Sequence, residues 1–417
     1  MAKVEHTELI SGSDRYRWFI LTAAVTAQMT AAVSTQGIGV LGGFIQEDLQ
    51  LSNTDIGVLA GILNVAPILG LLLAGEWLDR AGERLVIGIG ALIMGLAMTS
   101  AGVVTSFIAL VSCLFFVGVG YSTAQPGGTK AVFHWFSPSE RGLAMGIRQA
   151  GLPLGGVVAA AIFPSVASKL GWQSAFLVGA CVIISGGGVF CLVYRLPPAN
   201  QEGGGKPSHN RQQLIDYART LLTIPMFRLA AVSGVVMITI QTVSLMFLAL
   251  YLRDQFSLPL VVGASHLLVM QLAGAVGRIL LAAWSDHVRE GRASIVLFTA
   301  LGTVCGLAAL GLLSIHGSSS FMFLVSAWLG FFSFGWYGPW VAWVSELSLN
   351  ERLGATLGIA MAINQLAIVL TPILFGWLVD ESSGYAVPGG LLFVTLMIYI
   401  IYAGVLLWRR GGSRTSW

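Results

Sequence analysis

The chain has 417 residues, of which 56% are hydrophobic and only 10% are charged, and its formal net charge is +3. Soluble globular proteins carry about 25% charged residues, so this composition excludes an ordinary water-soluble protein. A hydrocarbon core about 30 Å thick needs about 20 apolar residues for each helix that crosses it. Runs of this length recur along the whole sequence, which predicts an all-α membrane protein with many spans.

The first apolar run follows Arg15 and Arg17 and extends from Trp18 to about Phe44. It is too long for the apolar core of a secretory signal peptide, so we expect an uncleaved first span. The cysteines all lie inside apolar runs, where they behave as small hydrophobic residues and not as a disulfide framework.

Twelve apolar runs, separated by charged residues or by Gly, Pro and Ser, predict twelve spans. Their approximate bounds are 18–44, 56–78, 85–103, 107–134, 142–167, 172–195, 227–252, 258–284, 293–314, 319–345, 353–378 and 387–408. The segment PPANQEGGGKPSHNRQQ, residues 197–213, has the composition of a linker and divides six spans from six. The predicted parts are an N-terminal segment 1–17, a bundle 18–195, a central loop 196–226, a second bundle 227–408 and a tail 409–417.

The basic residues predict the orientation. If the amino terminus is cytoplasmic, all 22 lysines and arginines except Lys169, Arg253 and Arg278 face the cytoplasm. Both termini are then cytoplasmic, and we expect a multi-pass protein of the cytoplasmic membrane. This topology explains the positive net charge, so no nucleic-acid partner is expected.

The two halves of the chain resemble each other, and internal repeats in transporters place the substrate site at the repeat interface. The matched residues are Trp77, Asp79 and Arg84 with Trp284, Asp286 and Arg292, and Glu140-Arg141 with Glu351-Arg352. Small residues also recur four apart, at Gly57 and Gly61, Gly151 and Gly155, and Gly354 and Gly358. This spacing indicates close helix contacts.

The segment GEWLDRAGER, residues 75–84, resembles the loop motif G-x-x-x-D-R-x-G-x-R of the major facilitator superfamily, with Glu83 where the family more often has a basic residue. The resemblance implies twelve transmembrane helices in two pseudo-symmetric six-helix bundles. In that family the motif acts as a latch of the outward-open state. The implied latch residues are Asp79, Arg80 and Arg84, and more weakly Asp286, Arg141 and Arg352. The alternative interpretation is a simple turn in a basic cytoplasmic loop.

The segment WFSPSERGLAMGIRQAGLPLG, residues 135–155, is similar to one found in monocarboxylate and bacterial oxalate transporters. It departs from theirs by one extra residue between Phe136 and Arg141, and by Arg148-Gln149 in place of a small apolar pair. The acidic-glycine-tryptophan motif that often precedes their first span is missing. The similarity implies a carrier of organic anions.

Arg278 is a candidate anion-binding residue because it lies inside the predicted eighth span, about 10 Å from its inner end at 1.5 Å per residue. A lone charge at the bilayer centre costs about 2.5–3.5 kcal/mol on insertion scales, and we expect no Asp or Glu deep in a span. A substrate anion would supply the missing charge; the alternative is that the side chain snorkels to the interface. In the carboxylate carriers that the chain resembles, an arginine at this distance before the aspartate, here Asp286, binds the substrate carboxylate.

Other residues are candidates for a polar path. Arg148 lies at a similar depth in the fifth span and alternatively faces the cytoplasmic vestibule. The remaining polar candidates are Gln28, Tyr121, Gln125, Gln241, Gln271 and Asn364, although such groups also form helix-to-helix hydrogen bonds. Within FFSFGWYGPWVAW we expect most aromatic residues to pack between helices, with Tyr337 and Trp340 as candidates for a pocket wall.

The leading hypothesis is a secondary active or facilitative transporter of a mono- or dicarboxylate, working by alternating access, with Arg278 binding the carboxylate. A coupling proton, uniport and anion exchange remain open. The alternative is a proton-coupled efflux antiporter for drugs or lipophilic compounds, because GLPLGG at 151–156 is close to the antiporter motif. An enzyme would need clustered acid, base or metal groups, which are not visible. We expect no cofactor or metal, and a monomer in the lipid bilayer.

Overall fold

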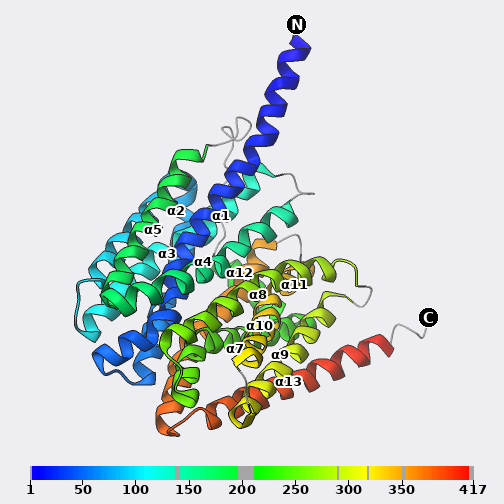
Figure 1. The fold of residues 1–417 in the computed structure, drawn as a ribbon. Helices are drawn as coiled ribbons and strands as arrows, with labels where there is room; N and C mark the ends of the chain where they lie inside the picture. The colour runs from blue at the N-terminus through cyan, green and yellow to red at the C-terminus, as the bar shows by residue number, and fades with distance from the viewer. Residues whose placement is uncertain are drawn as a thin grey trace. The chain divides into compact units, whose positions relative to one another are not determined.

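A computed structural model describes residues 2–136, 141–195, 211–288, 291–316, 319–349 and 353–412. The regular structure among these residues is α-helical (Figure 1). In chain order the helices are α1 Ala2–Leu49, α2 Asn53–Ala101, α3 Phe107–Trp135, α4 Arg141–Leu170, α5 Trp172–Val193, α6 Arg211–Thr223, α7 Pro225–Phe256, α8 Leu260–Ser285, α9 Arg292–His316, α10 Ser319–Gly335, α11 Tyr337–Glu346, α12 Leu353–Glu381 and α13 Ala386–Gly412.

Eleven stretches in the described part of the chain are long and apolar enough to cross a membrane, and Asn53–Ile68 is a shorter apolar helix. The predicted all-α class with many spans is therefore confirmed. This shorter helix overlaps the predicted second span, 56–78. The side chains of residues 69–76, within that predicted span, lie outside the part of the chain that the structure describes. The count of twelve spans stays a prediction.

The break predicted between the second and third spans lies at Gly82 within α2, where the backbone is not helical (φ 77°, ψ 161°), a conformation that glycine adopts at little cost. Two other elements differ from the prediction. The predicted span 319–345 is instead two helices, α10 and α11, separated at Trp336. Pro339, which lacks an N–H, cannot extend the hydrogen-bond ladder of α10. The predicted central loop contains the helix α6, which is too polar to be recognised as an apolar run.

The chain forms two compact units. The first unit contains residues 1–37 and 62–206, and the second contains residues 38–61 and 207–417. The end of α1 and the start of α2 therefore pack with the second unit. The predicted division into bundles 18–195 and 227–408 stays a prediction.

Glycine pairs permit close helix packing within each unit. In the first, a Cβ atom at Gly155 would collide with the Met29 carbonyl of α1, and one at Gly151 would lie only 3.1 Å from the Val25 carbonyl oxygen. In the second, a Cβ atom at Gly57 would collide with the Pro372 carbonyl of α12. The expected close contacts are confirmed for these positions, where only glycine lets the two backbones approach so closely.

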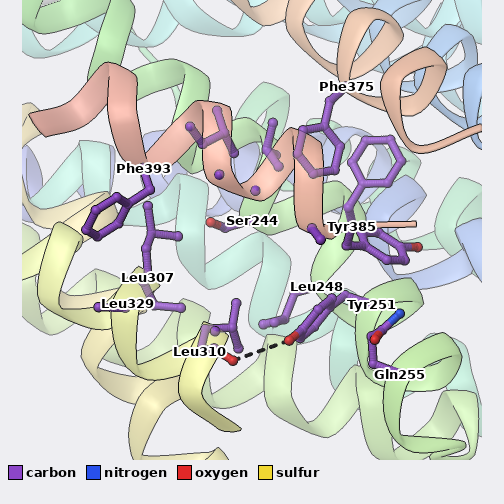
Figure 2. A pocket seen from close by; sticks show the side chains of 18 residues that line it. Ser244, Leu248, Tyr251, Gln255, Leu307, Leu310, Leu329, Phe375, Tyr385 and Phe393 are labelled. Atoms are coloured by element: carbon purple, nitrogen blue, oxygen red, sulfur yellow. Dashed lines mark hydrogen bonds between the residues drawn. The ribbon is translucent and has the colours of Figure 1, made fainter. Parts of the chain in front are cut away.

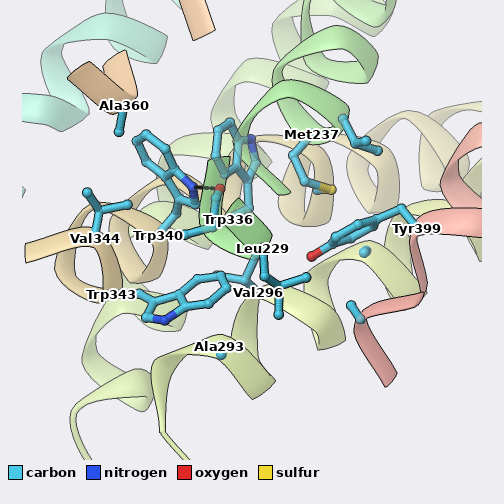
Figure 3. Packing of buried hydrophobic residues seen from close by; sticks show 14 of the residues in the cluster. Leu229, Met237, Ala293, Val296, Trp336, Trp340, Trp343, Val344, Ala360 and Tyr399 are labelled. Atoms are coloured by element: carbon cyan, nitrogen blue, oxygen red, sulfur yellow. Dashed lines mark hydrogen bonds between the residues drawn. The ribbon is translucent and has the colours of Figure 1, made fainter. Parts of the chain in front are cut away.

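The core of the second unit is built around α7, whose side chains are buried along most of its length. Trp336 and Trp340 are fully buried in this core, and Trp343 is 4% exposed (Figure 3). The two fully buried indole rings lie edge to face, with centroids 5.5 Å apart. One polar pair in the core is also hydrogen-bonded: Tyr399 donates a hydrogen bond of 2.8 Å to Ser233.

A polar cluster joins the start of α2 to the end of α12 within the second unit. Asp380 Oδ1 accepts hydrogen bonds from the backbone N–H and side-chain amide of Asn53, at 3.0 and 2.8 Å. Its Oδ2 accepts from the backbone N–H and hydroxyl of Thr54, at 2.8 and 2.6 Å. The carboxylate thus caps the amino end of α2, where N–H groups lack helical partners and negative charge is favoured. We call Asn53, Thr54 and Asp380 the clasp.

The same end of the second unit carries an ion-pair group beside the clasp. Arg253 lies 2.7 Å from Asp254 and 3.3 Å from Glu47, and donates to the Gln46 side chain at 2.7 Å. Tyr385 donates a hydrogen bond of 2.8 Å to Asp254. Burial, followed by the nearby Asp254 carboxylate, raises the pKa of Tyr385, so its hydroxyl stays protonated and remains a donor at neutral pH.

Candidate functional site

Arg148 in α4 is the centre of a polar cluster in the first unit. Its side chain is fully buried, and its Nη2 atom donates to Gln28 Oε1 of α1 at 3.0 Å. The same atom donates to the carbonyls of Ala124 and Gln125 in α3, at 3.2 and 2.7 Å. Gly128 provides the space, because a Cβ atom there would lie 2.6 Å from Arg148 Nε. The fold thus brings together Arg148, Gln28 and Gln125 from three helices.

Tyr121 lies one turn before Gln125 on α3, as the helical period predicts. Its side chain is 8% exposed, so it lies inside the unit and not on a lipid-facing surface. The first unit therefore offers a buried cation with phenol and amide groups on neighbouring helices.

Arg278 is the corresponding buried cation of the second unit. Its residue is 7% exposed, and its Nε atom donates to the Phe334 carbonyl at 3.2 Å. Its Cζ atom lies 5.1 Å from the centroid of the Tyr337 ring, within cation–π range. Phe334 is in the last turn of α10, where carbonyls lose their intrahelical donors. The break between α10 and α11 thus provides both the acceptor and the ring that orient Arg278.

The aromatic residues after the break face in different directions. Trp336 donates its indole N–H to Gln241 Oε1 at 3.0 Å, and Trp340 donates to the Ala230 carbonyl at 2.7 Å. Both rings are fully buried in the core, whereas Tyr337 is only partly buried and lies against Arg278. The structure therefore places Gln241 and Trp340 in helix packing and Tyr337 beside the candidate anion-binding residue.

Asn364 on α12 is buried, with 4% exposure. Neither its amide oxygen nor its amide nitrogen has a hydrogen-bond partner among the residues that the structure describes. It packs against Trp340 and Gly234, since a Cβ atom at Gly234 would lie 2.5 Å from its Oδ1. A buried amide without protein hydrogen-bond partners indicates that a water molecule or a ligand forms these hydrogen bonds. Gln271 is 2% exposed and lies two turns from Arg278 on α8.

The predicted latch residues are only partly described. The side chains of Asp79 and Arg141, and all of Arg352, lie outside the described residues, and Arg80 and Arg84 are exposed. In the second repeat, Arg292 lies 3.0 Å from Asp286 and 2.6 Å from Glu346, so α8, α9 and α11 are joined by one ion-pair group.

Sequence reasoning missed a buried carboxylate. Glu83 is 1% exposed and accepts a hydrogen bond of 3.1 Å from Tyr194. Its Oε1 atom lies 3.5 Å from Lys130 Nζ and 3.4 Å from His134 Nδ1. The departure from the loop motif at Glu83 was the available signal, because an acid in place of the usual base implies a different set of partners.

A charged residue follows a glycine of positive φ in each unit. Gly82 and Gly291 have φ values of 77° and 88°, and the residues that follow them are Glu83 and Arg292. In the first unit an acid lies beside Lys130 and His134, and in the second a base lies beside Asp286 and Glu346. The two ion-pair groups have opposite charge patterns, although Arg292 matches Arg84 and not Glu83 in the sequence repeat.

Within the part of the chain that the structure describes, no group of His, Cys, Asp and Glu side chains is arranged to hold a metal ion. The functional groups that the helices bring together are cations, amides and phenols. Such groups can bind an anion or a hydrogen-bonding ligand.

Comparison with known proteins agrees with this arrangement. The family model described as Major Facilitator Superfamily matches residues 24–348. The chain is 24% identical to the probable galactarate/D-glucarate transporter GudP of Bacillus subtilis over 93% of this chain and 92% of that protein. It is 27% identical to the 3-(3-hydroxy-phenyl)propionate transporter of Escherichia coli, covering 88% and 89% of the two chains.

The fold is similar to that of a solved bacterial homolog of the human lysosomal transporter Spinster, in an inward-facing and unoccupied conformation. The TM-score is 0.74, with 16% sequence identity, and the match covers 94% of this chain and 96% of that one. At this identity the likeness shows the fold alone.

Proposed function

The chain belongs to the major facilitator superfamily, a family of transporters and not of enzymes, and we propose that it moves a small organic anion across the membrane by alternating access. The substrate class is a mono- or dicarboxylate. In this proposal the chain is a twelve-span monomer of the cytoplasmic membrane with both termini in the cytoplasm.

The observation that carries the proposal is the position of Arg278. Its guanidinium is buried inside an integral membrane protein and is oriented by a backbone carbonyl and an aromatic ring. A guanidinium presents parallel donors that match the two oxygen atoms of a carboxylate. In the proposal this guanidinium binds the substrate carboxylate.

Arg148 is the second anion-attracting group in the proposal. Two buried cations that both reach the substrate path would raise the local concentration of an anion. Gln28, Gln125 and Tyr121 near Arg148, and Gln271 and Asn364 in the second unit, would bind the polar groups of the substrate. In the same proposal Gln241 and Trp340 stabilise the site indirectly, by packing in the core.

The relatives support an acidic substrate. Two relatives that are similar over most of their length are named as a probable galactarate/D-glucarate transporter and a 3-(3-hydroxy-phenyl)propionate transporter, and each of these molecules carries at least one carboxylate. Their carbon skeletons differ widely, so the carboxylate is the feature that they share. The neighbouring side chains would then recognise the rest of the substrate molecule.

Solute counterflow in proteoliposomes tests the proposal. Vesicles are loaded with one unlabelled acid and diluted into the same labelled acid, for a panel of sugar acids, aromatic acids and short monocarboxylates, with lipophilic cations as the alternative class. Transient accumulation of an acid, and no response to the cations, is the expected result. Accumulation of lipophilic cations alone would favour the efflux alternative. Counterflow at several pH values then separates proton-coupled transport from uniport and exchange.

A further inference from the structure

The second unit contains a cavity of about 390 Å³ between α7, α9, α10, α12 and α13 (Figure 2). This volume is within the range of about 300–1,000 Å³ that is usual for ligand sites. Its lining shares no residue with the candidate substrate site around Arg278. The walls are mainly apolar, so an acid from the aqueous phase is not a suitable occupant.

Three glycines leave part of this space open, because they have no side chain. Gly311 of α9 and Gly389 and Gly390 of α13 line the cavity. A Cβ atom added at any of the three would meet no heavy atom within 4 Å. All three are therefore positions where a larger residue can be introduced into open space without a collision at the Cβ atom.

The cavity reaches the outer surface of the unit between α9 and α13. Gly311, Ala386 and Gly390 are lining residues that are themselves exposed. Beside them, Leu312 is 65% exposed and Leu391 is 50% exposed. In an integral membrane protein such an apolar surface faces the lipid chains, which are as apolar as leucine. The mouth of the cavity therefore opens toward lipid.

The two ends of the cavity differ in polarity (Figure 2). Leu307, Leu329 and Phe393 lie at one end, and Tyr251 and Gln255 lie near the other. The Tyr251 hydroxyl donates to the Leu310 carbonyl at 3.3 Å, and Gln255 is exposed. Tyrosine with one apolar side and one polar tip is typical of the level where lipid chains meet headgroups.

We propose that this cavity binds one acyl chain of a bilayer phospholipid, which enters between α9 and α13. The methylene groups lie along the apolar walls, and the headgroup end lies near Tyr251 and Gln255. The driving force is packing and not transfer from water, because a lipid chain gains dispersion contacts with walls that otherwise face a void. The α13 segment from Ala386 to Phe393 rises about 10 Å, enough for several methylene groups.

Photocrosslinking in vesicles tests this site without any transport measurement, so its result is independent of the proposed function. The full chain is reconstituted in phosphatidylethanolamine that contains a small fraction of an analogue with a diazirine on one acyl chain. Labelled peptides are then mapped. A parallel sample receives a free fatty acid with the same diazirine, which distinguishes a phospholipid from a free amphiphile.

The variants are Gly389→Leu and Gly311→Leu, which fill the cavity from α13 and from α9. Gly404→Leu is the matched control, because it makes the same change on α13, also into open space, at a glycine that does not line the cavity. We expect labelling concentrated on the lining segments of α9 and α13, reduced to the level of the general lipid-facing surface in both filling variants and unchanged in the control.

Two results would overturn the proposal. The first is even labelling around the unit together with a higher melting temperature of the filling variants in lipid-free detergent, which would identify a dry void. The second is specific labelling by the free fatty acid with no specific labelling by the phospholipid, which would assign the cavity to a different ligand.

Discussion

The Arg278 guanidinium lies over the Tyr337 ring, with Cζ 5.1 Å from the ring centroid. Tyr337 is the first residue of α11, and the Phe334 carbonyl that also binds Arg278 belongs to the last turn of α10. The orientation of the cation therefore depends on the break between these helices. This relationship links a feature of the backbone, the interruption at Trp336, to the proposed chemistry of anion binding.

Removing the ring should weaken substrate binding more than removing its hydroxyl. Tyr337→Leu abolishes the cation–π contact, which is worth about 0.5–2 kcal/mol, so we expect the dissociation constant of a bound organic acid to rise about two- to thirty-fold. Tyr337→Phe keeps the ring and should stay near the wild-type value. Isothermal titration with the best acid from the counterflow panel measures both. A larger loss in the phenylalanine variant would assign the role to the hydroxyl instead.

Gln28 should stabilise the first unit through Arg148. Gln28→Leu removes an acceptor from a buried guanidinium, and hydrogen bonds to charged groups contribute about 1.5–3 kcal/mol, so the melting temperature should fall. Gln28→Glu is the matched variant, because it keeps an oxygen at the same position and adds a charge that suits Arg148. We expect it to melt at or above the wild type. If both variants are equally destabilised, the bond to Arg148 is not the cause.

The ion-pair groups around Glu83 and Arg292 predict unequal costs when the central charge of each is removed. Glu83→Gln removes the buried negative charge that lies beside Lys130 and His134. We expect this variant to lower the free energy of unfolding by about 2 kcal/mol or more. Arg292→Gln should cost less than about 1 kcal/mol, because its side chain is 26% exposed and its partners are more than half exposed. Thermal unfolding in one detergent compares them. Equal losses of stability in the two variants would contradict the claim that burial determines the cost of removing the charge.

The clasp and the predicted latch should respond to different measurements. Asp380→Asn weakens a helix cap worth about 1 kcal/mol within the second unit, so it should lower the melting temperature. Asp79→Asn removes the predicted latch and should favour the inward-open state. The readout is alkylation of Thr35→Cys by an impermeant reagent, in a background without native cysteines.

Glu381→Gln is the control for the clasp, because Glu381 follows Asp380 directly and is exposed. We expect a lower melting temperature in Asp380→Asn than in the control, and slower alkylation in Asp79→Asn alone. Equal melting temperatures of Asp380→Asn and the control would contradict the role of the clasp, and unchanged alkylation in Asp79→Asn would contradict the latch.

Local patterns predicted much of the fold. Apolar run length predicted the helical spans, and glycine spacing predicted the close contacts of α4 with α1. Helical periodicity placed Tyr121 and Gln125 together. Each of these features depends on residues within a few turns of one another, so the sequence carries the information directly.

Features that depend on distant residues were not predictable. The clasp joins Asn53 to Asp380, 327 positions apart, and nothing in either segment indicates the other. The burial of Glu83 depends on the bend at Gly82, which turns the side chain toward α3 and α5. The helix α6 was missed because its polar sequence resembles a linker, although Tyr217 and Leu221 are buried in the second unit.

The most direct test of the central claim is thermal unfolding of the purified protein with a panel of organic acids, inorganic anions, sugars and lipophilic cations, run beside Arg278→Gln and Arg278→Lys. An acid at 100 times its dissociation constant should stabilise the wild type by about 2.7 kcal/mol. We predict this shift for at least one carboxylate, its loss in Arg278→Gln and its partial retention in Arg278→Lys. Equal stabilisation of the wild type and Arg278→Gln by the same acid would contradict the assignment of Arg278 as the carboxylate-binding residue.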